Sequence, residues 1–300
     1  MYNCDVRLAV VLCVAGCGGG DPVATDAKPV DAPPVARCSP TGAFGAPKQL
    51  ASLDGPTEDL GGRLANDELS ILFSRTNADH TWDIWTASRA STDVDFGAPA
   101  VVGSINTIYS ELWPSVSPDG KALYFMSDRV TPGTYGIFVS TRASTTDPWG
   151  PPAASTDLMN GDSTPYLANA TGFYFAAGAP RMGAGMNDIY RATLDAAGKL
   201  TVIGAVLGGV DTPANELVPV VTADELHIYF ARNNGTDYDV FEASRSSLAD
   251  GFGAAAGVPG ISTIGYDELP SWVSPDGCHL YYSSAAGVTG NDLFMIARGT

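Results

Sequence analysis

Five carboxylates recur at one position of a repeated sequence pattern, and they are the residues best suited to chemistry. Each stands six residues before a Ser-Pro-Asp-Gly turn or its equivalent, near the start of a short strand. They are Asp59, Glu111, Asp162, Glu216 and Glu268. Carboxylates gathered in a ring raise one another's pKa unless a cation, an arginine or backbone donors compensate. Because hard cations favour several oxygen ligands, such a ring predicts a Ca²⁺ or cationic-ligand site.

Two other interpretations of these five carboxylates stay open. In the first, each carboxylate caps a neighbouring loop or pairs with an arginine of the adjacent repeat. Repetition favours this interpretation, because a catalytic group is usually needed once and not five times. In the second, two of the five are the paired acids of a glycosidase. Their near-equivalence weakens that hypothesis, since catalysis needs environments that push two pKa values apart. The sequence therefore assigns no catalytic residue.

The elements that would position these carboxylates form one motif written five times. An apolar triplet recurs, and its last members are 52, 50, 55 and 52 residues apart: Phe73, Phe125, Phe175, Phe230 and Tyr282. A second apolar strand follows each triplet, and an arginine stands six residues after its first position in four repeats: Arg89, Arg142, Arg245 and Arg298. Leu194 is the exception. A third element begins with an aromatic and a small residue, as at Phe96, Trp149 and Phe252.

Four short strands in each unit, repeated five times, predict an all-β, five-bladed β-propeller of four-stranded blades. The last repeat ends at Thr300 without an outer strand of its own. The missing strand is present at the other end, where Phe44-Gly45-Ala46-Pro47 matches the pattern that begins at Phe96. We therefore expect residues 44–50 to complete the fifth blade beside residues 292–298, which would remove exposed sheet edges.

This closure predicts a disulfide between Cys38 and Cys278. Cys278 follows the turn between the first and second strands of the last repeat, and Cys38 precedes the strand that completes the same blade. In an antiparallel order both positions fall at the same end of the blade. The alternative is two unpaired thiols.

The amino terminus reads as a targeting segment. The apolar run from Leu8 to Ala15 is too short to span a bilayer and fits a secretory signal. Val14-Ala15-Gly16-Cys17 resembles the bacterial lipobox, which implies a signal peptide over 1–16 and lipidation of Cys17. An ordinary signal peptide is the alternative. Residues 17–43, rich in Pro, Ala and Gly, are expected to tether the lipid to a propeller domain over 44–300.

Composition excludes several functions. The chain has 16 basic and 33 acidic residues and a net charge of −17, so phosphate backbones would repel it and nucleic-acid binding is not expected. Its three histidines, His80, His227 and His279, have no zinc-binding spacing, and no Gly-x-Ser-x-Gly elbow or P-loop is present. Asn233 to Asp239 is rich in side-chain oxygens but lacks EF-hand spacing, and we interpret it as a turn between strands.

The repeats also resemble a known family. The segment from Glu111 to Phe125, which contains Ser117-Pro118-Asp119-Gly120, and the segment from Glu268 to Tyr282 look like the WD40-like repeats of TolB-type periplasmic propellers. The resemblance covers residues 44–300 and is weakest in the third repeat. It implies an envelope propeller whose relatives mostly bind proteins, peptidoglycan-associated partners or small ligands, and are seldom enzymes.

The sequence thus leads us to expect a non-catalytic, lipid-anchored binding module for an envelope protein or a glycan. The alternative is a glycan-active hydrolase that uses carboxylates at the channel mouth. We expect a monomer, attached to the outer membrane through its lipid and facing the periplasm or the cell surface. No cofactor is expected, unless the carboxylate ring holds Ca²⁺.

Overall fold

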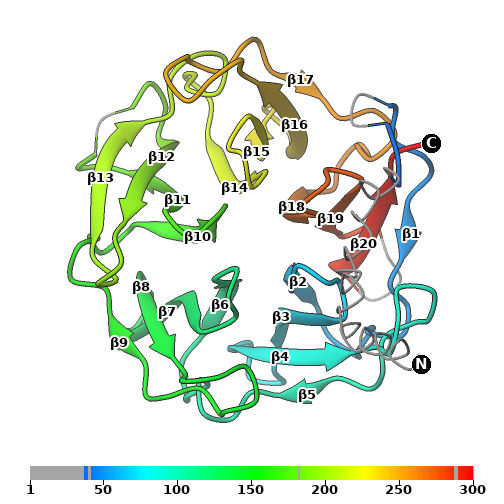
Figure 1. Cartoon of the computed structure of the whole chain (residues 1–300), viewed down its shortest axis with the longest axis vertical. Coiled ribbons are helices and arrows are strands. Elements are labelled where there is room, and N and C mark those ends of the chain that lie inside the picture. Colours follow the sequence, from blue (N-terminus) through cyan, green and yellow to red (C-terminus); the bar gives the residue numbers. More distant parts are fainter. Residues whose placement is uncertain (1–36, 40–41, 182, 287–289, 300) are drawn as a thin grey trace, which may run out of the picture. The chain divides into compact units, whose positions relative to one another are not determined.

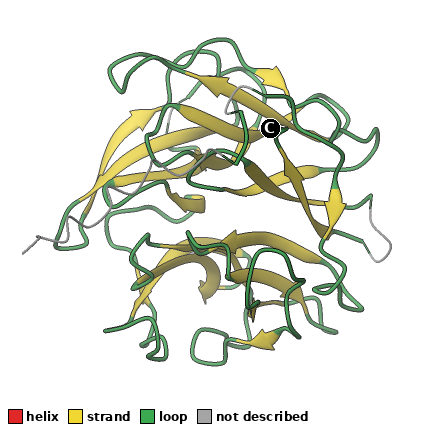
Figure 2. Cartoon of the chain, turned by 45° about the vertical axis from the view of Figure 1, so that its right-hand side comes forward, coloured by secondary structure: helices red, strands yellow, loops and turns green. Residues whose placement is uncertain are grey.

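The computed structural model describes residues 37–39, 42–181, 183–286 and 290–299. The chain divides into the units Met1–Arg37 and Cys38–Thr300, and the second unit contains every strand described below. The predicted signal peptide, Cys17 and most of the predicted tether lie outside the described residues. Within the described residues no helix is present, so none could cross a membrane (Figure 2).

The unit Cys38–Thr300 is a five-bladed β-propeller, as predicted (Figure 1). Blade 1 contains β2 (Asp59–Leu64), β3 (Ser70–Thr76), β4 (Trp82–Ser88) and β5 (Ala100–Val101). Blade 2 contains β6 (Glu111–Val116), β7 (Ala122–Thr131), β8 (Thr134–Thr141) and β9 (Ala153–Ala154). Blade 3 contains β10 (Ser163–Leu167), β11 (Gly172–Gly178), β12 (Asn187–Leu194) and β13 (Leu200–Ala205). Blade 4 contains β14 (Glu216–Val221), β15 (His227–Asn233), β16 (Tyr238–Ser244) and β17 (Ala256–Gly257).

Blade 5 joins the two ends of this unit and closes the ring. It contains β18 (Glu268–Val273), β19 (His279–Ser284), β20 (Asp292–Ala297) and, as its outer strand, β1 (Lys48–Gln49). Lys48 lies opposite Met295 in the antiparallel pair. The contact continues on both sides of β1, because the N–H of Gly45 donates to the Ala297 carbonyl and that of Leu50 donates to the Leu293 carbonyl, each at 2.8 Å. The predicted closing segment 44–50 is confirmed.

A repeated arginine–aromatic stack fixes the outer strands. In four blades the arginine near the end of the third strand lies over the aromatic ring that begins the outer segment. The pairs, with the distance from Cζ to the ring centroid, are Arg89 and Phe96 (4.4 Å), Arg142 and Trp149 (4.0 Å), Arg245 and Phe252 (4.5 Å), and Arg298 and Phe44 (3.9 Å). Blade 3 has Leu194 and Leu200 at the two positions. The repeated arginine and the repeated aromatic residue are therefore the two partners of one cation–π contact.

The predicted disulfide is present between Cys38 and Cys278. Their Cα atoms are 5.6 Å apart, and the bond encloses a sequence separation of 240 residues. Both cysteines are buried. The bond fastens the segment that precedes β1 to the turn between β18 and β19, so it reinforces the closure of blade 5.

Blade-to-blade packing explains the apolar triplets. Phe73, Phe125, Phe175 and Phe230 are fully buried in the second strands, and the core clusters extend across neighbouring blades. The axis itself is narrow. Gly61, Trp113, Thr164 and Val218 have positive φ at bulges of the innermost strands and line a cavity of only about 10 Å³. The two ends of the channel are therefore separate places for a ligand.

Candidate functional site

The five predicted carboxylates lie at the start of the five innermost strands. Asp59, Glu111, Glu216 and Glu268 are the first residues of β2, β6, β14 and β18, and Asp162 directly precedes β10. All five are between 0 and 2% exposed, so their charges are buried inside the blades. Among the described residues no group of three or more His, Cys, Asp or Glu could hold a metal ion. The Ca²⁺ hypothesis thus finds no ligand cluster here and stays a prediction.

Four of the five carboxylates pair with an arginine. The arginine comes from the second strand of the same blade or from the loop that follows it, and not from the adjacent blade. The closest contacts are Asp59 with Arg75 (2.7 Å), Glu111 with Arg129 (3.0 Å), Asp162 with Arg181 (2.8 Å) and Glu216 with Arg232 (2.8 Å). Because a buried carboxylate is stable as an ion only when it is paired and hydrogen-bonded, these four are structural charges.

Glu268 is the exception. Ser284 faces Glu268 across β18 and β19, at the place where Arg75 faces Asp59 and Arg232 faces Glu216. The Ser284 hydroxyl donates to Glu268 Oε1 at 3.0 Å, and the Thr263 backbone N–H donates to Oε2 at 3.2 Å. No guanidinium or ammonium pairs with this carboxyl in the part of the chain that the structure describes. Glu268 therefore has two neutral donors and no countercharge.

Burial raises the pKa of Glu268, Asp59 and Glu216, and Glu268 is the one of these three whose shift no arginine opposes. Burial, together with the smaller effect of the Asp239 and Asp237 charges, raises the pKa of Glu268 to about 7, although the hydrogen bonds from Thr263 and Ser284 oppose the shift. Burial also raises the pKa of Asp59, to about 6, although Arg75 opposes the shift. Near neutral pH Glu268 is thus divided between its acid and its carboxylate form, which is the condition that a proton donor and acceptor requires.

Carboxylates of neighbouring blades approach one another at this end of the propeller. In three blades the aspartate at or near the start of the third strand interacts with the ring carboxylate of the next blade: the charge of Glu216 raises the pKa of Asp188, Asp239 raises that of Glu268, and Asp292 raises that of Asp59. The two interfaces that blade 5 forms with its neighbours differ in how this repulsion between carboxylates is compensated. Arg75 compensates Asp59, whereas Glu268 has only Asp239 and Asp237 beside it. Blades 4 and 5 therefore present a carboxyl pair without a neutralising cation.

The turn Asn234–Asp237 joins β15 to β16, as predicted, and lies beside the carboxyl groups of Glu268 and Asp239. Asp237 is buried, and the Gly265 backbone N–H donates to its Oδ2 at 2.5 Å. Asp239 is partly exposed and accepts a hydrogen bond from Asn234 Nδ2 at 2.7 Å. The oxygen-rich turn thus positions two carboxylates against the loop that covers Glu268.

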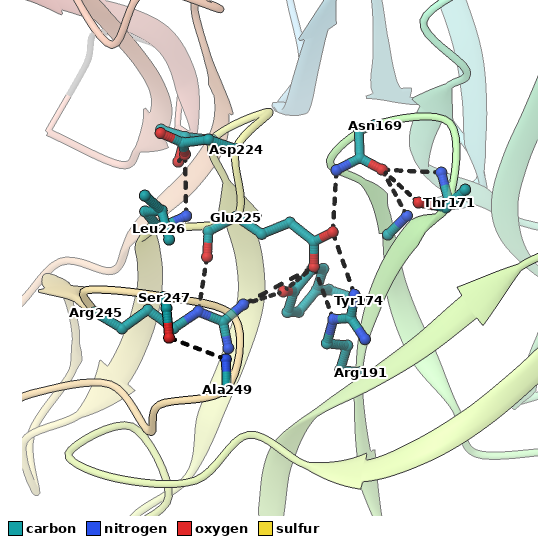
Figure 3. Close-up of polar contacts among 12 residues, drawn as sticks. Asn169, Thr171, Tyr174, Arg191, Asp224, Glu225, Leu226, Arg245, Ser247 and Ala249 are labelled. Atoms are coloured by element: carbon teal, nitrogen blue, oxygen red, sulfur yellow. Dashed lines mark hydrogen bonds and ion pairs between the residues drawn. The ribbon is translucent and has the colours of Figure 1, made fainter.

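A second buried glutamate was not identified from the sequence. Glu225 lies in the turn before β15 with a positive φ, and it binds residues of blade 3 (Figure 3). Its carboxylate accepts hydrogen bonds from Tyr174 at 2.6 Å, Arg191 at 2.7 Å and Asn169 at 3.0 Å. These donors outweigh burial and lower the pKa of Glu225. The cluster locks blade 4 to blade 3 and leaves no free carboxylate for chemistry.

Glu68 plays the same part between blades 1 and 5. It also has a positive φ in the turn before the second strand, and it contacts His279 Nδ1 at 2.7 Å and the Tyr281 hydroxyl at 3.2 Å. His80 lies in the loop before β4, and His227 begins β15. The histidines are therefore placed at turns and strand ends, without a shared site among the described residues.

Comparison with solved structures supports the fold. A TolB-type structure from Agrobacterium tumefaciens is 14% identical, covers 79% of this chain and 76% of its own, and has a TM-score of 0.50. For TolB from Acinetobacter baumannii the identity is 17% and the TM-score 0.49, and the match covers 83% of this chain but only 56% of that protein. The chain has a TolB-like propeller fold. No family model matches the sequence, and no curated protein matches it.

Glycoside hydrolases match over a larger share of their own length than the TolB structures do. A thermostable family-43 glycoside hydrolase is 13% identical over 82% of this chain and 90% of its own, with a TM-score of 0.54. A GH43_1 enzyme from Xanthomonas citri, in complex with xylotriose, is 14% identical over 85% of this chain and 90% of its own, with a TM-score of 0.56. At this identity the likeness shows the fold alone.

These neighbours correct the expectation of a non-catalytic binding module. That expectation rested on relatives that are seldom enzymes and on the equivalence of the five carboxylates. The propellers that match it include glycoside hydrolases, which cover 82% and 85% of this chain. The five carboxylates are also not equivalent, because only Glu268 lacks an arginine partner. The alternative drawn from the sequence, a glycan-active hydrolase, is the one favoured.

Proposed function

We propose that the protein is a glycoside hydrolase and that Glu268 is its general acid. The observation that carries the proposal is the environment of Glu268, whose carboxyl is the one ring member without a guanidinium and has a pKa of about 7. Glycosidases pair one carboxylic acid that stays protonated with one carboxylate that stays ionised. The structural likeness to family-43 glycoside hydrolases supports the same class of reaction.

Asp239 is the second carboxylate of the proposed site. It lies near enough to raise the pKa of Glu268, and it is more exposed than Glu268. Protonated Glu268 would deliver its proton to the oxygen of the leaving sugar as the glycosidic bond breaks, while ionised Asp239 would stabilise the positive charge that develops on the other sugar. A water molecule would then add to the anomeric carbon and give its proton to the ionised Glu268, which restores the acid. The contrast between a buried acid and a partly exposed carboxylate gives the two groups separate roles.

The loop between β17 and β18 controls access to Glu268. The loop carries exposed Ile264 and Tyr266, while its Thr263 N–H donates to the Glu268 carboxyl. Gly260 and Gly265, which have positive φ, lie within this loop. A substrate oxygen reaches the carboxyl when it replaces the Thr263 contact, so the proposal requires this loop to move during binding.

A hydrolysis screen tests the proposal. The purified protein is incubated with xylan, xylo-oligosaccharides and a wider panel of polysaccharides, and the release of reducing sugar is measured for wild type, Glu268→Gln and Glu111→Gln. The two variants make the same isosteric change at equivalent strand positions. We expect turnover by wild type, its loss in Glu268→Gln, and its retention in Glu111→Gln below the melting temperature of that variant. Absence of turnover on the whole panel, or full activity of Glu268→Gln, would overturn the proposal.

We also propose that the protein is exported and anchored to the cell envelope through Cys17. The Cys38–Cys278 disulfide supports export, because such bonds persist in oxidising compartments. Metabolic labelling with a fatty acid tests this, with Cys17→Ser as the comparison. Incorporation into wild type and not into the variant is the expected result, and equal labelling of both contradicts it.

A further inference from the structure

The innermost strand of blade 1 carries a second feature, far from Glu268. Arg63 lies near the end of β2, whereas the ring carboxylate Asp59 begins that strand, so Arg63 lies toward the opposite end of the channel. Its side chain is almost entirely buried, with 6% exposed. A guanidinium stays charged in proteins, and a buried charge is unfavourable unless something compensates it.

Arg63 has an incomplete set of partners. Its Nη2 donates to the Leu167 carbonyl, and its Cζ lies 3.7 Å from the centroid of the Tyr166 ring. The second terminal nitrogen, Nη1, is buried and has no hydrogen-bond partner among the residues that the structure describes. Among the described arginines that pair with the ring carboxylates, each has a buried acid beside it; Arg63 pairs with no carboxylate. The ring and one carbonyl compensate only part of its charge.

The surroundings of Arg63 form a cavity on the propeller axis. Its volume is about 60 Å³, and all five blades contribute to its lining, including Tyr166, Val221 and Trp272. No Asp or Glu is among the lining residues, although the chain has a net charge of −17. The space admits groups larger than a water molecule, which is enough for a carboxylate group.

The same arginine borders a larger cleft between blades 1 and 2. This cleft has a volume of about 550 Å³, within the range of small-molecule sites. The hydroxyl-bearing residues Ser70, Ser104 and Thr145 line it, together with half-buried Arg142. Its two acids are engaged in turns, since Asp67 accepts the Leu69 N–H and Asp147 accepts the Ser144 hydroxyl. The cleft therefore offers polar groups for a sugar ring next to an uncompensated cation.

We propose that Arg63 binds the carboxylate of a sugar acid in the axial cavity, with the sugar ring in the cleft between blades 1 and 2. The carboxylate supplies the missing acceptor for Nη1 and neutralises the guanidinium, and the serine and threonine hydroxyls bind those of the sugar. The site lies at the other end of the channel from Glu268. It is a ligand site independent of the proposed hydrolysis, so either can fail without the other.

Binding of galacturonate tests the site, with galactose as the neutral counterpart of the same shape. Calorimetry and thermal melting are measured for wild type, Arg63→Met, Arg63→Lys and Lys121→Met, the last removing an exposed cation that lines neither the axial cavity nor the cleft. We expect galacturonate, and not galactose, to bind wild type and raise its melting temperature. Arg63→Met should weaken binding by roughly tenfold or more, Arg63→Lys should restore part of it, and Lys121→Met should bind as wild type does.

Three results would overturn the proposal. Galactose binds as well as galacturonate, neither sugar binds, or Arg63→Met binds galacturonate as tightly as wild type does. A dipeptide with a free carboxyl terminus is a further probe, and a response to it without a response to galacturonate would exclude a sugar acid. If Arg63→Met does not fold, the comparison of galacturonate with galactose on wild type still decides between these outcomes.

Discussion

Arg298 lies over the ring of Phe44, with 3.9 Å between its Cζ and the ring centroid, and this contact joins the two ends of the propeller. The same arginine donates to the Tyr229 hydroxyl at 2.8 Å and to Glu242 at 3.1 Å, so it also links blade 5 to blade 4. Phe44 thus takes the place that Phe96 takes in blade 1. Phe44, which precedes blade 1 in the sequence, therefore completes blade 5.

Replacement of Phe44 by alanine should destabilise the ring. Loss of the buried ring surface and of the cation–π contact is expected to lower the free energy of unfolding by ~2 kcal/mol. Phe96→Ala is the matched control, since it removes the equivalent ring within a blade that is continuous in sequence. Chemical denaturation measures both. A Phe44→Ala protein as stable as wild type would show that the outer strand does not hold the ring closed.

Reduction of the Cys38–Cys278 bond should weaken the same closure. The chain-entropy model gives ~5 kcal/mol for a loop of this length, and we expect part of that value because the remaining contacts of β1 persist. The double variant Cys38→Ser and Cys278→Ser provides the comparison. Thiol counting on denatured, unreduced protein checks the bond itself, and two reactive thiols at these positions would contradict it.

The fold could be predicted from the sequence because its repeated contacts use repeated residues. Arginine at the end of the third strand and the aromatic that follows it recur together, and both are missing from the third repeat, where Leu194 and Leu200 stand. The closing segment was recognisable because Phe44 begins the same pattern. In blades 1, 2 and 4 the arginine and the aromatic are only seven residues apart, so the motif can be recognised from the sequence before the packing is known.

The sequence contains the feature that distinguishes Glu268 from the other four ring carboxylates. Arg75 and Arg232 stand 16 residues after their carboxylates, and Arg129 stands 18 residues after Glu111. The last repeat has Ser284 at the same spacing and no arginine between Glu268 and Arg298. The five carboxylates are equivalent only in their own positions within the repeat. Their charge state depends on whether an arginine stands in the second strand or in the loop that follows it.

Glu225 shows what the sequence could not supply. Its role depends on a positive φ in a turn and on Tyr174 and Arg191 of another blade, 51 and 34 residues away. In the chain it is one of many acidic residues in turns. Only the packing of blade 4 against blade 3 gives it three donors.

Removal of Glu225 should therefore cost far more stability than removal of a comparable surface glutamate. Glu225→Ala leaves Arg191 and Tyr174 without their acceptor and is expected to destabilise by ~3–5 kcal/mol. Glu242→Ala is the matched control, because Glu242 pairs with Arg298 but is 34% exposed, and its loss should be within ~1 kcal/mol. Equal effects of the two substitutions in urea denaturation would contradict a locking role for Glu225.

Glu268 should make stability depend on pH in a defined direction. Its ordinary pKa of 4.5 is raised to about 7, so the folded protein keeps the proton to higher pH than the unfolded chain does. Its favourable contribution is complete below pH 4.5 and is lost as pH rises through 7. Glu268→Gln cannot ionise, so its stability relative to wild type should rise over this window by at most ~3 kcal/mol. A constant difference between pH 4 and 9 would argue against the raised pKa.

The most direct test of Glu268 as general acid is the dependence of its effect on the leaving group. The values of kcat/KM are compared for wild type and Glu268→Gln on an oligosaccharide, whose leaving oxygen must be protonated, and on a dinitrophenyl glycoside of the same sugar, whose leaving group departs unprotonated. We predict a loss of roughly 10²–10⁴-fold on the oligosaccharide and a much smaller loss on the dinitrophenyl glycoside. Equal losses on both substrates, or no loss on either, would contradict the assignment.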